Sequence, residues 1–130
     1  MLSITRKTIL VVDDEPAILG LVNTILTFSG YRVLVANGPI EAIDIFRRTG
    51  AVDLLLSDVD MPQMDGGSLA AHLVRLRPRL RVLLMTGSDR AKAQATGGRF
   101  RILCKPFSMS ALREVVNATL NSSVAAAPVH

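Results

Sequence analysis

Five short runs of apolar residues alternate with segments of helical periodicity along this chain of 130 residues. Most of the runs are rich in valine, leucine and isoleucine, as are strands that a parallel sheet buries on both faces. Strands that alternate with helices in this way predict a parallel sheet with helices on both of its faces. The predicted strands are Thr8–Val12, Arg32–Ala36, Asp53–Ser57, Arg81–Met85 and Arg101–Cys104.

The predicted fold class is α/β, with the five strands in the flavodoxin-like order 2-1-3-4-5. Helix boundaries are also readable. Pro16 suits the first turn of the first helix, and Gly30 follows its last turn. Ser108 is suited to cap the last helix. Apolar side chains at helical spacing are expected to face the sheet, and these include Leu21, Ile40 and Met109.

One domain accounts for a chain of this length. We expect an N-terminal lead over residues 1–7, the folded domain over residues 8–121 and a flexible tail over residues 122–130. The stretch between Thr86 and Lys105 has no large apolar residue in its middle, so we expect a short, mobile fourth helix there.

The chain contains no apolar run of the roughly 20 residues that span a membrane. Its N-terminus is too short and too polar for a signal peptide. A single cysteine, Cys104, excludes an internal disulfide and fits a reducing compartment. Because this cysteine ends an apolar run, we expect a buried core thiol. We therefore expect a cytoplasmic protein without a membrane partner.

The net charge of +4 is unevenly distributed. Six of the 11 acids lie in the loops that follow the first and third predicted strands. Four arginines cluster near the start of the fourth strand, at the opposite end of the sheet. We expect them to form a solvated basic edge and not a nucleic-acid site, because aromatic residues for base stacking are few. The four are Arg75, Arg77, Arg79 and Arg81.

Polar side chains follow four of the predicted strands. Asp13 and Asp14 come after the first strand, and Asp58 comes after the third. Parallel neighbouring strands bring these carboxylates to one edge of the sheet, where they would repel one another without a cation. Oxygen ligands in a partly open site suit Mg²⁺, which also accepts phosphate oxygens. Thr86 and Lys105, after the fourth and fifth strands, add a hydroxyl and a positive charge.

These motifs resemble the receiver domains of bacterial two-component response regulators (the CheY-like superfamily). The resemblance covers residues 8 to 120. The matching pieces are Val11-Val12-Asp13-Asp14-Glu15, Asp58-Val59-Asp60-Met61-Pro62-Gln63-Met64-Asp65-Gly66, Met85-Thr86-Gly87 and Lys105-Pro106-Phe107.

The resemblance implies a role for each position. Asp58 would accept a phosphoryl group, and Asp13, Asp14 and Asp58 would bind Mg²⁺ together with the backbone carbonyl of Asp60. Thr86 and Lys105 would contact the phosphoryl oxygens, and the Lys105–Pro106 peptide bond would be cis. The implied partners are a sensor histidine kinase or phosphotransfer protein and a downstream protein. The chain would be no enzyme beyond catalysing its own phosphorylation and dephosphorylation.

The chain departs from the family pattern in two places. Ile102 stands where the family commonly has a switching aromatic, and Phe100 falls on the same face of the strand. Asp60 places an additional acid beside the phosphoacceptor. A degenerate receiver that acts only as an interaction module remains an alternative. An aspartyl-phosphate phosphatase is a weaker one, because the order of its acidic motifs would be reversed. The chain is either a stand-alone receiver or part of a larger regulator or hybrid kinase.

The Asp65-Gly66 pair is expected to form a turn in which glycine supplies a positive φ. We assign it no catalytic role.

Overall fold

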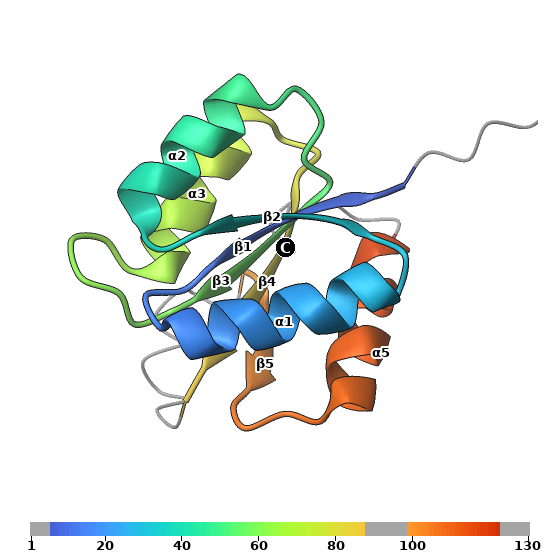
Figure 1. Ribbon diagram of the computed structural model, residues 1–130. Helices are drawn as coiled ribbons and strands as arrows, with labels where there is room; N and C mark the ends of the chain where they lie inside the picture. The colour runs from blue at the N-terminus through green and yellow to red at the C-terminus, as the bar shows by residue number, and fades with distance from the viewer. Residues whose placement is uncertain (1–5, 88–98, 123–130) are drawn as a thin grey trace, which may run out of the picture.

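Residues 6–87 and 99–122 are described by the computed structural model, and they form a five-stranded sheet between two layers of helices (Figure 1). All strands are parallel, in the order β2-β1-β3-β4-β5. The predicted α/β class and strand order are therefore confirmed. The strands are β1 (Thr8–Val12), β2 (Arg32–Ala36), β3 (Leu54–Asp58), β4 (Arg81–Thr86) and β5 (Arg101–Cys104).

Three strands have the predicted bounds, while β3 is displaced by one residue and β4 ends one residue later. Asp53 precedes β3, and its Oδ2 accepts a hydrogen bond of 2.8 Å from the backbone N–H of Thr8. At the other end, Asp58 pairs with Met85 in the register of β3 and β4. Asp58 and Thr86 are thus the last residues of neighbouring strands.

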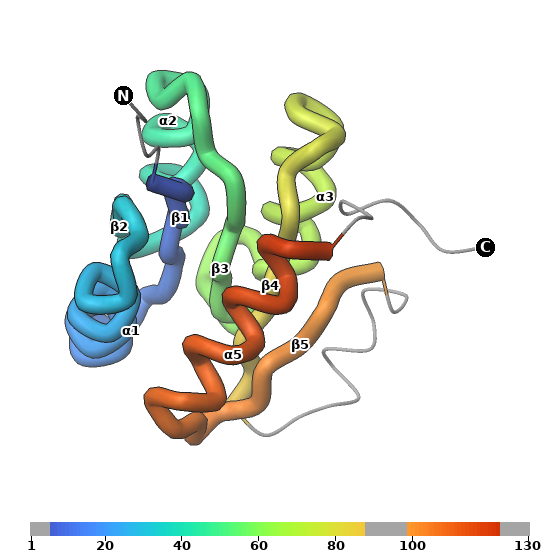
Figure 2. The backbone as a smooth tube through the Cα atoms, turned by 90° about the vertical axis from the view of Figure 1, so that its right-hand side faces the viewer, coloured from blue at the N-terminus to red at the C-terminus, as the bar shows by residue number. Residues whose placement is uncertain are grey.

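Two pairs of helices cover the sheet. Helices α1 (Pro16–Phe28) and α5 (Met109–Leu120) pack on one face, and α2 (Pro39–Arg48) and α3 (Gly66–Leu76) pack on the other. Figure 2 shows α5 passing over β4 and β5, which it contacts. The central strands β1 and β3 are buried along their whole length, which explains their continuous apolar sequences.

The predicted helix boundaries are confirmed at three positions. Pro16 is the first residue of α1, and Gly30 follows that helix with φ 98°, a conformation that glycine adopts without a Cβ penalty. The Ser108 side chain accepts a hydrogen bond of 3.0 Å from the backbone N–H of Ala111 and so caps α5.

Three of the apolar side chains that were expected to face the sheet are largely exposed, so the predicted burial of Met109 is wrong. Leu21, Ile40 and Met109 are 49%, 63% and 55% exposed. Ile40 and Met109 lie in the first turns of their helices, and Leu21 lies in the second turn of α1. Periodicity marks the apolar side of a helix but not how far the opposing layer extends.

The prediction of a buried thiol is also wrong, because Cys104 is exposed. This cysteine is the last residue of β5, an edge strand whose neighbour in the sheet is β4. An apolar run predicts burial only where a second layer covers that end of the strand.

The basic edge is only partly solvated as predicted. The Arg77 guanidinium donates hydrogen bonds of 3.0 and 2.9 Å to the carbonyls of Phe46 and Thr49, and it stacks 4.1 Å from the centre of the Phe46 ring. Arg81 donates to the carbonyl of Ser122 at 2.7 Å. These two arginines join the ends of α2 and α5 to the rest of the fold.

The predicted fourth helix, between Thr86 and Lys105, falls mainly on residues 88–98, which lie outside the described residues, as do most of the predicted lead and tail. None of the helices within the described ranges combines the length and apolar composition that a membrane span requires.

Candidate functional site

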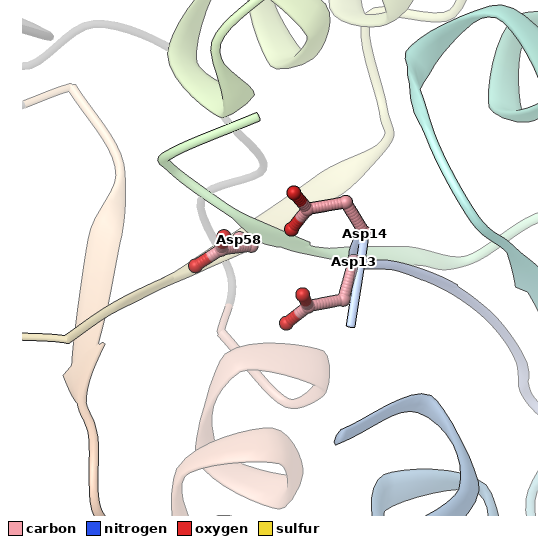
Figure 3. A group of neighbouring side chains, drawn as sticks. All are labelled: Asp13, Asp14 and Asp58. Carbon is pink, nitrogen blue, oxygen red and sulfur yellow. The ribbon is translucent and has the colours of Figure 1, made fainter. Parts of the chain in front are cut away.

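Three carboxylates converge at the carboxyl ends of β1 and β3. Ligand atoms of Asp13, Asp14 and Asp58 all lie within 4.8 Å of one another. Figure 3 shows the Asp13 and Asp14 side chains extending toward the side on which Asp58 lies. Asp13 and Asp58 are buried, whereas Asp14 is exposed and leaves the group open to solvent.

The ammonium of Lys105 lies against this group. Its Nζ is 3.0 Å from Asp58 Oδ1, 3.1 Å from Asp13 Oδ2 and 3.9 Å from Glu15 Oε1. The backbone N–H of Lys105 donates a 2.7 Å hydrogen bond to the carbonyl of Thr86, which ties the ends of β4 and β5 together. The Lys105–Pro106 peptide bond is cis, as the resemblance implies.

The electrostatics of the group reflect this crowding. Burial raises the pKa of Asp58 to about 6; the hydrogen bond from Lys105 opposes the rise, and the charge of Asp13 adds to it. Burial acts to lower the pKa of Lys105, but the hydrogen bonds to Asp58 and Asp13 outweigh it and raise that pKa. One ammonium thus only partly offsets three carboxylates.

A buried hydroxyl lies at the end of the adjacent strand. Thr86 is fully buried, and its Oγ1 has no hydrogen-bond partner within the described ranges. A buried hydroxyl without a partner costs about 1–3 kcal/mol. Thr86 ends β4 beside Asp58 at the end of β3, so its hydroxyl is placed to donate a hydrogen bond to an oxygen of a group bound at Asp58.

The backbone of Asp58 is tightly held. Ser57 Oγ donates a 3.0 Å hydrogen bond to the Asp58 carbonyl, and the Val59 N–H donates to Met85 at 2.8 Å. A Cβ built on Gly66 would overlap the Asp58 carbonyl oxygen. Sequence reasoning missed these supports from Ser57 and Gly66, because their contacts depend on the register of β3 and the path of the following loop.

The predicted turn at Asp65-Gly66 has a different structure. Asp65 is the N-cap of α3 and accepts a 2.8 Å hydrogen bond from the Ser68 N–H, while Gly66 is the first helical residue. The positive φ in this loop belongs to Gln63, at 76°. Gly66 is required for the close approach to Asp58 and not for a left-handed turn.

The structure therefore brings Asp13, Asp14, Asp58 and Lys105 together, with Thr86 ending the strand next to Asp58. Asp60 lies in the exposed loop after β3, and its backbone carbonyl stays a predicted ligand. The clustered oxygens fit a hard divalent cation, because they are all carboxylate and one side of the group is open.

An apolar cavity lies next to the site. It has a volume of ≈ 240 Å³ and is lined by residues of α1, the end of β4 and the loop after β5. The lining residues are Ile18, Leu21, Gly87, Lys105, Pro106 and Phe107. The exposed side chain of Leu21 therefore lines a hollow beside Lys105.

Ile102 and Phe100 both pack into the core between the sheet and the helices α2 and α3, as strand alternation predicts. Phe100 is buried just before β5 begins, at the end of the sheet away from Asp58.

Comparison with known proteins agrees with this fold and this acidic group. Residues 9–117 match the family model described as the response regulator receiver domain. The chain belongs to this family, whose members are signalling domains of two-component systems and typically use Mg²⁺.

Two relatives show where such domains occur. The chain is 34% identical over 121 residues to the transcriptional regulatory protein GlrR of Escherichia coli, covering 91% of this chain and 27% of that protein. It is 35% identical over 118 residues to the sensor kinase CckA of Brucella abortus, covering 87% of this chain and 12% of that protein. The chain therefore spans only a small part of these relatives.

A solved structure shares the fold over nearly its whole length. A response regulator receiver protein from Sinorhizobium medicae superposes with a TM-score of 0.84 at 27% identity, covering 92% of this chain and 98% of that one.

Proposed function

We propose that this chain accepts a phosphoryl group on Asp58 from a phosphohistidine of a sensor histidine kinase or phosphotransfer protein. The observation that carries the proposal is the convergence of Asp13, Asp14 and Asp58 within 4.8 Å, with Lys105 bonded to two of them. Membership of the receiver-domain family supports this proposal, since receiver domains are signalling domains.

In the proposed reaction an oxygen of the ionised Asp58 carboxylate attacks phosphorus. The new oxygen–phosphorus bond forms as the phosphorus–nitrogen bond of the donor breaks. The electron pair of the broken bond stays on the imidazole nitrogen, and the histidine leaves neutral when its other ring nitrogen carries a proton. The protein's task is then positioning and charge neutralisation, as in phosphoryl transfer generally.

Three groups of this chain would do that work. The hydrogen bonds at the end of β3 and the contact with Gly66 hold the Asp58 main chain in place. Lys105 would exchange its bond to Asp58 for one to a phosphoryl oxygen, and Thr86 Oγ1 would donate to another. That second bond would also supply the partner that the buried Thr86 hydroxyl lacks in the described part of the chain.

Asp13, Asp14, Asp58 and the backbone carbonyl of Asp60 would bind Mg²⁺. When bound, the ion neutralises negative charge on the phosphoryl oxygens and on the carboxylates. The three carboxylates fit it, because Lys105 alone leaves them with excess negative charge.

The apolar cavity beside Lys105 is the proposed contact for the phosphodonor, since a partner must approach this end of the sheet. The folded receiver is proposed to span residues 8–121, to act in the cytoplasm and to signal to a downstream protein by conformational change. An order–disorder switch in residues 88–98, expected from their lack of apolar anchors, lies outside the described residues.

Incubation with acetyl phosphate, followed by intact-mass measurement, tests the proposal. The wild-type chain should gain one phosphoryl group with Mg²⁺ and none after chelation, and Asp58→Asn should gain none. Glu114→Gln, which changes an exposed carboxylate on α5, should behave as wild type. A wild-type chain that stays unmodified with Mg²⁺ would instead be a degenerate receiver, and turnover of a phosphate ester would indicate a phosphatase.

Mg²⁺ is expected to raise the thermal stability of the protein. A ligand that binds only the native state adds about 1.4 kcal/mol at ten times its dissociation constant. Asp13→Ala and Asp14→Ala should show a smaller increase in melting temperature on adding millimolar Mg²⁺, and Glu114→Ala should keep the full increase. If both aspartate variants respond as wild type does, the ion binds elsewhere.

A further inference from the structure

The end of the sheet opposite Asp58 is strongly basic. Because the strands are parallel, all of them begin at this end. β2, β4 and β5 each begin with an arginine, and two cations directly precede β1. The cations of this row are Arg6, Lys7, Arg32, Arg81, Arg99 and Arg101.

The helices add a second group of cations at the same end. Each helix runs back against the strand before it, so α2 and α3 finish where the strands start (Figure 1). Hydrogen bonds from Arg77 to the carbonyls of Phe46 and Thr49 confirm that these two helix ends meet. The second group consists of Arg47, Arg48, Arg75, Arg77 and Arg79.

These two groups, which we call the basic end, hold 11 of the 15 lysines and arginines of the chain. Among the described residues two carboxylates lie near them, and both are engaged. Asp44 is paired with Arg48 at 2.9 Å, and Asp53 accepts the Thr8 N–H. At the other end of the sheet, Asp13, Asp14 and Asp58 gather in one group. Counted over residues 6–87 and 99–122, the positive charge of the basic end is therefore mostly uncompensated.

Most of these cations are free to meet a ligand. Only Arg77 and Arg81 are half-buried, and the other nine side chains are exposed. A hollow of ≈ 380 Å³ opens at the starts of β1 and β2, and its lining includes Arg6, Lys7 and Arg32 beside one acid, Asp53. The row of strand starts offers a place where an anionic group can approach several cations at once.

We propose that the basic end binds the phosphodiester backbone of duplex nucleic acid without reading its sequence. Five strands about 4.8 Å apart make a row roughly 19 Å wide, along which a duplex presents roughly ten phosphate charges. Ten of the 11 cations are arginines, and one guanidinium group can donate two parallel hydrogen bonds to the oxygens of a phosphate. The scarcity of aromatic residues, 4% of the chain, fits backbone contacts and not base stacking.

Other anionic partners fit this surface less well. Protein interfaces centre on buried apolar or aromatic anchors, and binding to a lipid surface needs apolar side chains that insert together. At this end the large exposed apolar side chains are those of Phe28 and Leu76, within the described residues. They belong to α1 and α3, which cover opposite faces of the sheet, so they form no common anchor.

The inference goes beyond the proposed phosphoacceptor function and does not depend on it. It also replaces the expectation of a solvated edge that is no nucleic-acid site, which was drawn from four arginines and the scarcity of aromatic residues. Few aromatics argue against base stacking but not against contacts with phosphates. The topology adds the cations at the strand starts and the end of α2, which are scattered along the sequence. Asp58 lies at the other end of β3, so Asp58→Asn should bind nucleic acid as wild type does.

Fluorescence anisotropy with a labelled random-sequence DNA duplex, over a series of KCl concentrations, tests the proposal. The wild-type chain should bind, and its affinity should fall steeply with salt. The combined variant Arg32→Gln, Arg47→Gln, Arg75→Gln and Arg79→Gln should bind at least about 10-fold more weakly at low salt. Its salt slope should be smaller by roughly one for each phosphate that an arginine no longer neutralises. All four side chains are exposed.

A matched pair separates position from net charge. Arg75→Gln should weaken binding, while Arg113→Gln, in the second turn of α5 and away from the basic end, should not. Circular dichroism should show that every variant is folded. Wild-type protein that fails to bind at low salt overturns the proposal, as does a folded combined variant that binds as wild type does. Tighter binding to polyglutamate or to phosphatidylserine vesicles than to DNA would also overturn it.

Discussion

Asp58→Asn is expected to make the metal-free protein more stable than wild type at pH 7. Burial raises the pKa of Asp58 to about 6 from an ordinary value of 3.8, so the folded state disfavours the charged carboxylate. The neutral amide removes this cost and relieves repulsion with Asp13. One pKa unit corresponds to about 1.4 kcal/mol, so the free energy of unfolding should rise by about 1–3 kcal/mol after allowing for the weakened bond to Lys105.

The pH dependence distinguishes this cause from a packing effect. Between pH 3.8 and about 6 the folded wild-type protein binds more protons at Asp58 than the unfolded chain does. Its stability from this group therefore falls as pH rises through that window. The advantage of Asp58→Asn should be absent near pH 4, grow toward pH 6 and then stay constant.

Urea unfolding with EDTA, at several pH values, measures this difference. Glu114→Gln is the control, because its carboxylate is exposed. Adding Mg²⁺ should reduce or reverse the advantage of the asparagine variant, since the ion favours the ionised carboxylate. An asparagine variant that is less stable than wild type at pH 7 without metal would contradict the account of Asp58.

Gly66→Ala is expected to destabilise the protein by at least about 2 kcal/mol, the cost of forcing an additional methyl into a tightly packed site. The new Cβ would overlap the Asp58 carbonyl oxygen, lie 2.9 Å from the Asp58 carbonyl carbon and lie 3.1 Å from Val59 Cα. These are backbone atoms, and they cannot rotate away. The loop that positions Asp58 must shift, so phosphorylation by acetyl phosphate should slow as well.

Gly20→Ala provides the matched control. Gly20 lies in α1, and a Cβ built there meets nothing within 4 Å. In a helix interior the same change should stabilise the protein by roughly 0.5–1 kcal/mol. Denaturant unfolding of the two variants should therefore show changes of opposite sign. Equal stability of Gly66→Ala and wild type would mean that the contact at Asp58 is looser than the structure has it.

Much of the fold could be predicted from the sequence, because its strands and helices are consistent with local patterns. The runs that became β1 and β3 are apolar throughout, and both strands are buried on both faces. Proline, glycine and serine mark the ends of α1 and the start of α5 where the structure has them. The carboxyl ends of parallel strands meet at one edge, which is why Asp13 and Asp58 could be placed together.

Features that depend on tertiary packing could not be predicted. The requirement for Gly66 arises from a carbonyl eight positions earlier in the chain, and no local rule reports that distance. The exposure of Cys104 depends on which layer reaches the corner of the sheet. Arg77 looked like a solvated charge, yet it binds two carbonyls from another helix and loop.

The separation of acids and arginines to opposite ends of the strands has a physical consequence at long range. It gives the molecule a permanent electric dipole moment that runs along the direction of the strands. A charged body that approaches experiences a torque as well as a force, so the molecule rotates before any side chain makes contact. At physiological ionic strength the Debye length is about 8 Å, so this rotation takes place only in the last stage of the encounter. At low salt it begins farther away, and the correct end is presented in a larger share of collisions.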